Sequence, residues 1–191
     1  ESVAWITERK DLLNLFFFLM TVLFYLRYNQ ASETNKKVFY GLTLLHFALS
    51  LMAKPMTITL PTVLLILDFY PLRRIEKSNS WLIIEKIPFF MLSLIVFLIN
   101  IWTASLTDTI TKNFSFITTL FIAARGYVFY IVKMIIPVNL APLYPYPSNV
   151  DIFTFEYIGS AVILFVITSF CLSSLRRGRL ILSVWIYYIV T

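Results

Sequence analysis

The sequence predicts an all-α polytopic membrane protein, and three observations lead to that prediction. Hydrophobic residues make up 59% of the 191 positions and charged residues only 14%, whereas soluble domains average about half apolar and about a quarter charged. The mean hydropathy is +0.81. The apolar residues also lie in long runs, several of them close to the roughly 20 residues that a helix needs to cross a bilayer.

These apolar runs mark the expected helices in order along the chain. Residues 12–28, 38–53, 88–103 and 157–175 are expected to cross the membrane, and residues 180–191 begin a further crossing. The segment at 56–71 is shorter and contains Pro61 and Asp68. We expect it to cross only if its helix is continuous with the flanking chain.

Basic residues in three loops orient these segments. The loops are RYNQASETNKK with Arg27, Lys36 and Lys37, PLRRIEKSNS with Arg73, Arg74 and Lys77, and LRRGRL with Arg176, Arg177 and Arg179. Cytoplasmic loops of membrane proteins carry an excess of lysine and arginine, so all three loops are expected in the cytoplasm. The crossings at 38–53 and 56–71 return the chain to the same side, which agrees with that assignment.

Residues 114–137 are expected to form a helix that lies at the interface or re-enters the membrane. An even number of crossings must separate the second and third basic loops, so one of the three apolar segments between them does not cross. Arg125 and Lys133 single out this segment, because an arginine near the bilayer centre costs about 3 kcal/mol on insertion scales. Their spacing of eight residues puts both on one helix face.

Charged residues are expected to gather on the opposite, extracytoplasmic side. They are Glu8, Arg9 and Asp11 in ESVAWITERKD, which Glu1 can join, Lys54 in AKPMT, and Arg125 and Lys133 on the interfacial helix. We expect a wet, charged cavity at this membrane edge. Simpler interpretations stay open: Asp11 can cap the following helix, Lys54 can reach the interface from a helix end, and the interfacial helix can keep Arg125 wet.

Several classes of function are excluded. The net charge of +6 is explained by the basic loops, so no nucleic-acid partner is expected. Cys171 is the single cysteine and cannot form an internal disulfide, and the single His46 argues against a histidine metal site. There is no glycine-rich phosphate loop, zinc pattern or nucleophile elbow. For Asp68, a salt link to Arg73 or Arg74, or exposure at the interface, is the expected explanation.

Three stretches, in order through nearly the whole chain, carry a resemblance. ESVAWITERKDLL is similar to a loop that ends in Arg-x-Asp-Leu-Leu at a helix start. LMAKPMTITLPTVLLILDFYPL is similar to a Lys-Pro turn, a following Leu-Pro and an Asp-aromatic helix end. ARGYVFYIVKMIIPVNLAPLYPYP is similar to an Arg-x-x-x-x-Tyr helix followed by Pro-x-x-Leu-Ala and Tyr-Pro-x-Pro. Together they resemble the multi-spanning glycosyltransferases with a C-terminal tetratricopeptide array, which are related to protein O-mannosyltransferases and share the GT-C membrane fold.

The resemblance implies a GT-C-like helical bundle and an enzyme. It would move a sugar, in the first instance mannose, from a polyprenyl- or dolichyl-phosphate donor to serine or threonine hydroxyls of an acceptor protein. Residues 1–191 would be a partial transmembrane module, with the catalytic loop upstream of Glu1 and the tetratricopeptide repeats both absent, and the fragment alone would be inactive. The module would lie in a bacterial inner membrane or the endoplasmic reticulum membrane, with its active face periplasmic or lumenal.

Site residues follow from the same resemblance. Asp11 and Arg9 match the family's second acidic motif, where Asp11 would orient the acceptor or contact a divalent metal, Mg²⁺ or Mn²⁺, and Glu1 would join them. Lys54 and Arg125 match basic positions near the lipid phosphate, and Lys133 would join those. Lys10 departs from the small residue that the family often has between the arginine and the aspartate.

Two alternatives from other classes stay open. A secondary transporter would also place charges in a membrane cavity, but usually near the midplane and in broken helices related by internal repeats. No internal repeat is visible in this sequence. A non-catalytic membrane anchor for a tetratricopeptide interaction domain would tolerate neutralisation of Asp11 or Arg125.

Overall fold

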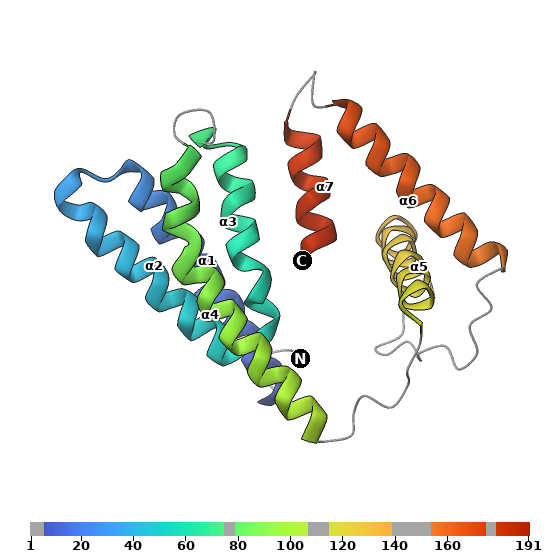
Figure 1. The fold of residues 1–191 in the computed structure, drawn as a ribbon, viewed down its shortest axis with the longest axis horizontal. Coiled ribbons are helices and arrows are strands. Elements are labelled where there is room, and N and C mark those ends of the chain that lie inside the picture. The colour runs from blue at the N-terminus through green and yellow to red at the C-terminus, as the bar shows by residue number, and fades with distance from the viewer. Residues whose placement is uncertain (1–5, 75–78, 107–114, 139–153, 175–178) are drawn as a thin grey trace. The chain divides into compact units, whose positions relative to one another are not determined.

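The computed structural model describes residues 6–74, 79–106, 115–138, 154–174 and 179–191. Over these ranges the chain is all-helical, with seven α-helices, one 3-10 helix and no strand (Figure 1). The elements are α1 Ile6–Gln30, α2 Glu33–Ala53, η1 Pro55–Thr59, α3 Leu60–Phe69, α4 Asn79–Leu106, α5 Phe116–Ile135, α6 Phe155–Ser173 and α7 Leu180–Val190. The all-α prediction is therefore confirmed for the described part of the chain.

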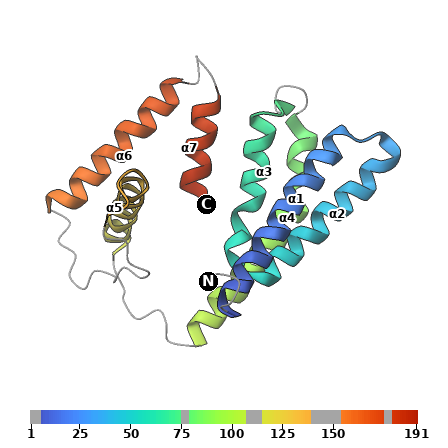
Figure 2. The same ribbon diagram turned by 180° about the vertical axis from the view of Figure 1, so that it is seen from behind.

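The helices form two compact units. The first comprises residues 1–109 with 186–191, and the second comprises residues 110–185. In the first unit, α1 and α2 pack against each other as an antiparallel hairpin, and α4 contacts α2, α3 and η1 (Figures 1 and 2). In the second unit α5 packs against α6, and the Trp185 indole N–H donates to Thr168 Oγ1 at 3.1 Å.

Two prolines explain why α2 ends at Ala53 and why η1 and α3 follow it. Lys54 has an extended backbone, with φ −156° and ψ 127°, because a residue that precedes proline is disfavoured in the helical region. Pro55 then starts η1, and Pro61 lies in the first turn of α3. Backbone N–H groups in a first turn have no intrahelical acceptor, so the N–H that Pro61 lacks costs no helical hydrogen bond. The predicted segment at 56–71 is thus a short 3-10 turn followed by a ten-residue helix.

Apolar side chains cover much of the outside of both units, and several polar side chains are buried beside a hydrophobic core. Leu19, Ile83 and Phe165 are 56%, 66% and 74% exposed. The buried side chains, in contrast, include Thr21, Thr43, Ser50, Asp68 and Lys86. A soluble monomer rarely exposes so much contiguous apolar surface, whereas a helix in lipid presents such a surface and satisfies its backbone internally.

Four helices are long and apolar enough to cross a membrane. They are Arg9–Gln30, Leu82–Leu106, Phe116–Ile135 and Phe155–Ser173. Together with the apolar exterior they indicate a multi-pass integral membrane protein, as the sequence predicted. The predicted crossing at 38–53 lies in α2, a helix that is not among these four.

Two helix boundaries differ from the predictions, and the placement of α5 relative to the membrane stays a prediction. α4 begins at Asn79, nine residues before the predicted start at Pro88, because its charged first turns pair inside the first unit (below). α1 begins by Ile6 and so includes the charged residues before position 12. The predicted helix at 114–137 exists as α5. Its length and composition also allow it to cross, and its interfacial or re-entrant placement stays a prediction.

Candidate functional site

One end of the first unit, which we call the Asp11 end, joins two residues that the sequence singled out. Lys54 Nζ lies 2.5 Å from Asp11 Oδ1, and the two side chains are 37% and 53% exposed. α1 already extends back to Ile6, so Asp11 sits inside the helix and the capping interpretation is wrong. Lys54 follows the last turn of α2, which is where the hairpin brings it beside α1.

A triad of polar side chains near this pair connects α1, α2 and η1. Ser50 Oγ donates to Asn14 Oδ1 at 2.6 Å and reaches Thr57 Oγ1 at 2.9 Å, and Thr57 Oγ1 donates to Asn14 Oδ1 at 2.5 Å. Asn14, Ser50 and Thr57 belong to α1, α2 and η1 respectively. Because Ser50 and Thr57 are buried, these bonds hold the positions of Asp11 and Lys54 relative to each other.

The other predicted site residues have different surroundings. Arg9 is exposed on α1, and Glu1 lies outside the described residues. In the second unit, Arg125 Nη2 lies 2.7 Å from Glu156 Oε2 on α6, and its guanidinium lies 5.3 Å from the Tyr157 ring centroid. The Lys133 ammonium donates to the backbone carbonyl of Val138. Glu156 is a partner that the sequence did not point to.

No metal centre is found among the described residues, since no group of three or more histidine, cysteine or acidic side chains could hold an ion there. Divalent cations such as Mg²⁺ prefer several oxygen ligands, and Asp11 is not part of such a group within that part of the chain. The His46 Nδ1 lies 2.8 Å from the Leu42 carbonyl oxygen, and its ring packs 4.8 Å from that of Phe24. This is a packing role, as expected.

The opposite end of the first unit, the Arg74 end, contains a group of charges that sequence reasoning largely missed. We call Tyr25, Asp68, Arg74, Glu85 and Lys86 the buried charge cluster. Asp68 and Lys86 have side chains 0% and 1% exposed, and Lys86 Nζ lies 2.9 Å from Asp68 Oδ2 and 2.7 Å from Glu85 Oε1. Arg74 lies 3.2 Å from Asp68 and 2.9 Å from Glu85. Two acids and two bases therefore balance.

The Tyr25 hydroxyl lies at the centre of this cluster. It donates to the Asp68 carboxylate, whose oxygens are 2.6 and 2.7 Å away, and accepts from Lys86 at 2.6 Å and from Arg74 at 2.7 Å. Within the described residues, every buried side-chain nitrogen or oxygen has a hydrogen-bond partner. Burial by itself lowers the pKa of Arg74. The hydrogen bond and charge of Glu85 and the charges of Tyr25 and Asp68 raise this pKa by more than burial lowers it, so the guanidinium stays protonated.

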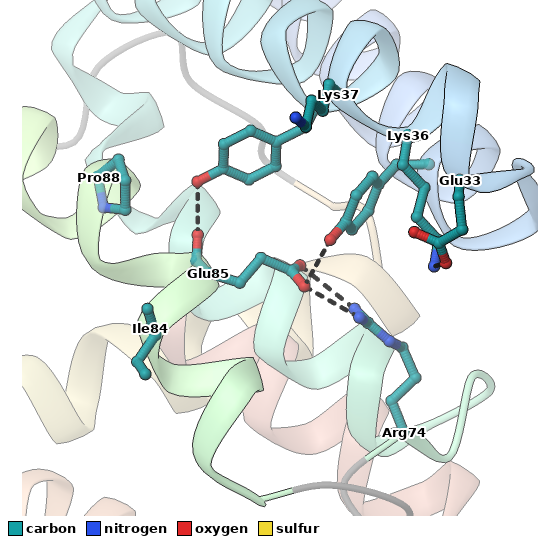
Figure 3. A pocket seen from close by; sticks show the side chains of 9 residues that line it. Glu33, Lys36, Lys37, Arg74, Ile84, Glu85 and Pro88 are labelled. Atoms are coloured by element: carbon teal, nitrogen blue, oxygen red, sulfur yellow. Dashed lines mark hydrogen bonds and ion pairs between the residues drawn. The ribbon is translucent and has the colours of Figure 1, made fainter.

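A cavity of about 800 Å³ opens beside the cluster (Figure 3). We call it the Arg74 pocket. Figure 3 shows Glu33, Lys36 and Lys37 on one side, Ile84, Glu85 and Pro88 of α4 on the other, and Arg74 at the edge. Its lining residues are Tyr28, Glu33, Lys36, Lys37, Tyr40, Arg74, Ile84, Glu85 and Pro88.

The first two basic loops lie at one end of this unit, which agrees with their expected place on one side of the membrane, and their cytoplasmic location stays a prediction. Lys36 and Lys37 line the same pocket as Arg74, so the two loops lie at one end. Asp11 and Lys54 lie at the other, since Asp11 and Tyr25 are separated by roughly 20 Å of helix. The expected salt link from Asp68 to Arg74 is confirmed. The alternative prediction, that Asp68 is exposed at the interface, is wrong, because its side chain is buried.

Glu85 and Lys86 were missed because the predicted helix began at Pro88. The available signal was the pair of adjacent opposite charges in WLIIEKIPFF. Charges inside an apolar run face partners in the helix bundle far more often than lipid. The partners themselves lie far away in sequence, and Lys86 is 61 positions after Tyr25.

The fold, together with the Asp11 end and the Arg74 end of the first unit, indicates a class of protein: a polytopic all-helical membrane protein with charged groups at both ends of one helical unit. Comparison of the chain with protein-family models, with curated proteins and with solved structures finds no match.

Proposed function

We propose that this chain acts as a membrane glycosyltransferase of the GT-C type. It moves a sugar, mannose in the first instance, from a polyprenyl- or dolichyl-phosphate donor to serine or threonine hydroxyls of protein on the extracytoplasmic face. The observation that carries the proposal is the contact between Asp11 and Lys54. It joins the first two of the three stretches on which the family resemblance rests, across 43 positions of sequence.

The chemistry explains why such a pair is useful. During transfer, the bond from the anomeric carbon to the phosphate oxygen breaks, and a bond from that carbon to the acceptor hydroxyl oxygen forms. The hydroxyl proton passes to a carboxylate base, and the departing phosphate keeps the electron pair. Lys54 stabilises the charge that develops on the phosphate, and Asp11 orients the acceptor or a divalent metal.

The exposure of the pair favours exchange of partners. An ion pair between solvent-accessible side chains contributes at most about 1 kcal/mol. A donor phosphate can therefore displace Asp11 from Lys54 at little cost and leave the carboxylate beside the reacting sugar. Arg9 and Arg125 are the further residues that the family resemblance assigns to this chemistry, and the sequence pattern adds Lys133.

The test compares Asp11→Asn with Lys10→Gln in the full-length protein, at matched expression in native membranes. Transfer of labelled mannose from a polyprenyl-phosphate donor to protein is the measurement. Loss of a positioning group lowers kcat/KM by about 100-fold, and Asp11→Asn should do so while the free energy of unfolding changes by about 1 kcal/mol or less. Lys10→Gln, a charge change at the adjacent exposed position, should leave transfer unchanged.

Unchanged transfer in Asp11→Asn would mean that the Asp11–Lys54 contact is only a surface ion pair with no role in transfer. Absence of transfer from the full-length wild-type protein with every donor sugar would refute the proposal. Function that survives neutralisation of both Asp11 and Arg125 would favour a non-catalytic anchor for a partner-binding domain.

A secondary transporter is the second candidate, and the buried charge cluster favours it. Ionisable side chains inside a bundle of membrane helices often mark ion or proton pathways, and Asp68 and Lys86 are fully buried. The double variant Asp68→Asn/Lys86→Met separates the two functions. A transferase should keep mannose transfer once folded protein is matched, whereas a transporter should lose ion-coupled uptake into proteoliposomes.

A further inference from the structure

We propose that the Arg74 pocket binds the headgroup of one anionic phospholipid from the surrounding leaflet. The phosphate would lie against Lys36 and Lys37 of α2, with the acyl chains along α4. This site lies at the opposite end of the first unit from Asp11 and Lys54, and it does not depend on the proposed transferase activity.

The charge balance of the lining leaves a cation available to a ligand. Glu85 is already neutralised, since its carboxylate accepts from Arg74 Nη2 at 2.9 Å, from Lys86 Nζ at 2.7 Å and from the Tyr28 hydroxyl at 3.1 Å. Lys36 pairs with Glu33 at 2.5 Å. Lys37 is exposed and has no ion pair within the described residues. The rim therefore carries a net positive charge.

Apart from the neutralised Glu85, the opposite wall of the pocket is apolar and continues into the lipid-facing surface. Ile84 and Pro88 of α4 line it. Ile83 and Ile87 on the same helix are 66% and 50% exposed. A cavity with a cationic rim and an apolar wall that runs outward fits an amphiphile, with the polar group in the pocket and the chains beside the helix.

Depth and side also favour a lipid over a soluble anion. Tyr28 and Tyr40, whose rings pack 5.6 Å apart, line the pocket beside the lysines, and tyrosines concentrate at the level of the headgroups. The basic loops at this end are those that the positive-inside rule assigns to the cytoplasm. Anionic phospholipids are enriched in that leaflet, and basic pockets between membrane helices bind their headgroups.

Two double variants with equal loss of charge test the proposal. Lys36→Gln/Lys37→Gln removes the two rim lysines. Arg27→Gln/Arg73→Gln removes two exposed cations at the same end that do not line the pocket. The full chain is purified in mild detergent, and native mass spectrometry measures how much phosphatidylglycerol or phosphatidylcholine stays bound, with and without inorganic phosphate. Helical circular dichroism checks that each variant is folded.

The wild type should retain phosphatidylglycerol in preference to phosphatidylcholine, and inorganic phosphate should not displace it. The lysine variant should bind about tenfold more weakly, since each lysine near an anionic headgroup contributes roughly a threefold to fivefold factor. The arginine variant should bind as the wild type does.

Three results would overturn the proposal. Equal losses in both double variants would mean a general effect of surface charge. Equal retention of phosphatidylcholine would mean an apolar groove without headgroup recognition. Displacement by inorganic phosphate at comparable concentration would mean a site for a soluble anion instead of a lipid.

Discussion

Replacing Lys86 by methionine should destabilise the first helical unit strongly, because it removes one charge from a balanced and buried set. The Lys86 ammonium has three hydrogen-bond acceptors within reach, on Tyr25, Asp68 and Glu85, at 2.6, 2.9 and 2.7 Å. Methionine keeps much of the volume and none of the donors. The cluster is then left with two carboxylates and a single guanidinium.

The size of the effect follows from what remains around the buried carboxylate. Removing one partner of a buried ion pair costs about 3–5 kcal/mol. Asp68 still has Arg74 at 3.2 Å and the Tyr25 hydroxyl at 2.6 Å. We therefore expect a loss at the lower end of that range, about 3 kcal/mol.

The assay is unfolding by SDS in mixed micelles of a zwitterionic detergent, followed by far-UV circular dichroism. Lys36→Met is the matched control, since it makes the same substitution in an ion pair of 2.5 Å that is exposed to solvent. An exposed pair contributes about 1 kcal/mol or less. The control should therefore shift the unfolding midpoint far less than Lys86→Met does.

The double variant Asp68→Asn/Lys86→Met separates charge imbalance from lost packing. It leaves Arg74 and Glu85 as a balanced pair, so it should be more stable than Lys86→Met alone, with a coupling energy of about 2 kcal/mol. A loss below about 1 kcal/mol in Lys86→Met, or strictly additive losses in the double variant, would refute the reasoning.

Two further substitution and labelling experiments probe the interior. Tyr25→Phe removes the hydroxyl that connects Asp68, Arg74 and Lys86 and should cost about 2 kcal/mol, whereas Tyr28→Phe at the pocket rim should cost about 1 kcal/mol; equal losses in the same SDS titration would argue against a central role for Tyr25. Cys171 is 4% exposed, so a maleimide dye should label it slowly in mild detergent and quickly in SDS. Fast labelling in mild detergent would contradict its burial.

The sequence alone was sufficient for the all-α class and for most helices, and the reason is local. Lipid imposes a length and a composition on each crossing separately, so a run such as the one in α6 can be recognised without its neighbours. Charge in the loops likewise indicates which ends of α2 and α3 lie on the same side. The position of Lys36 and Arg74 in one pocket agrees with that indication.

Boundaries and pairings depended on contacts that no local pattern contains. Pro88 suggested a helix start, yet α4 runs through it from Asn79, because Glu85 and Lys86 find partners on other elements and need not remain in water. The sequence placed Asp11 and Lys54 on one side of the membrane, and only the packing of α1 on α2 put them 2.5 Å apart.

Hydropathy thus determined that this chain is a multi-pass helical protein, and tertiary packing decided where its charges meet. The free energy of a charge in a membrane depends on its partners, and for Asp68 these are Tyr25, 43 positions before it, together with Arg74 and Lys86 after it. A linear pattern records that such charges are present. Only the three-dimensional arrangement shows that they neutralise one another, because Coulomb interactions and hydrogen bonds depend on distance in space, not on distance along the chain.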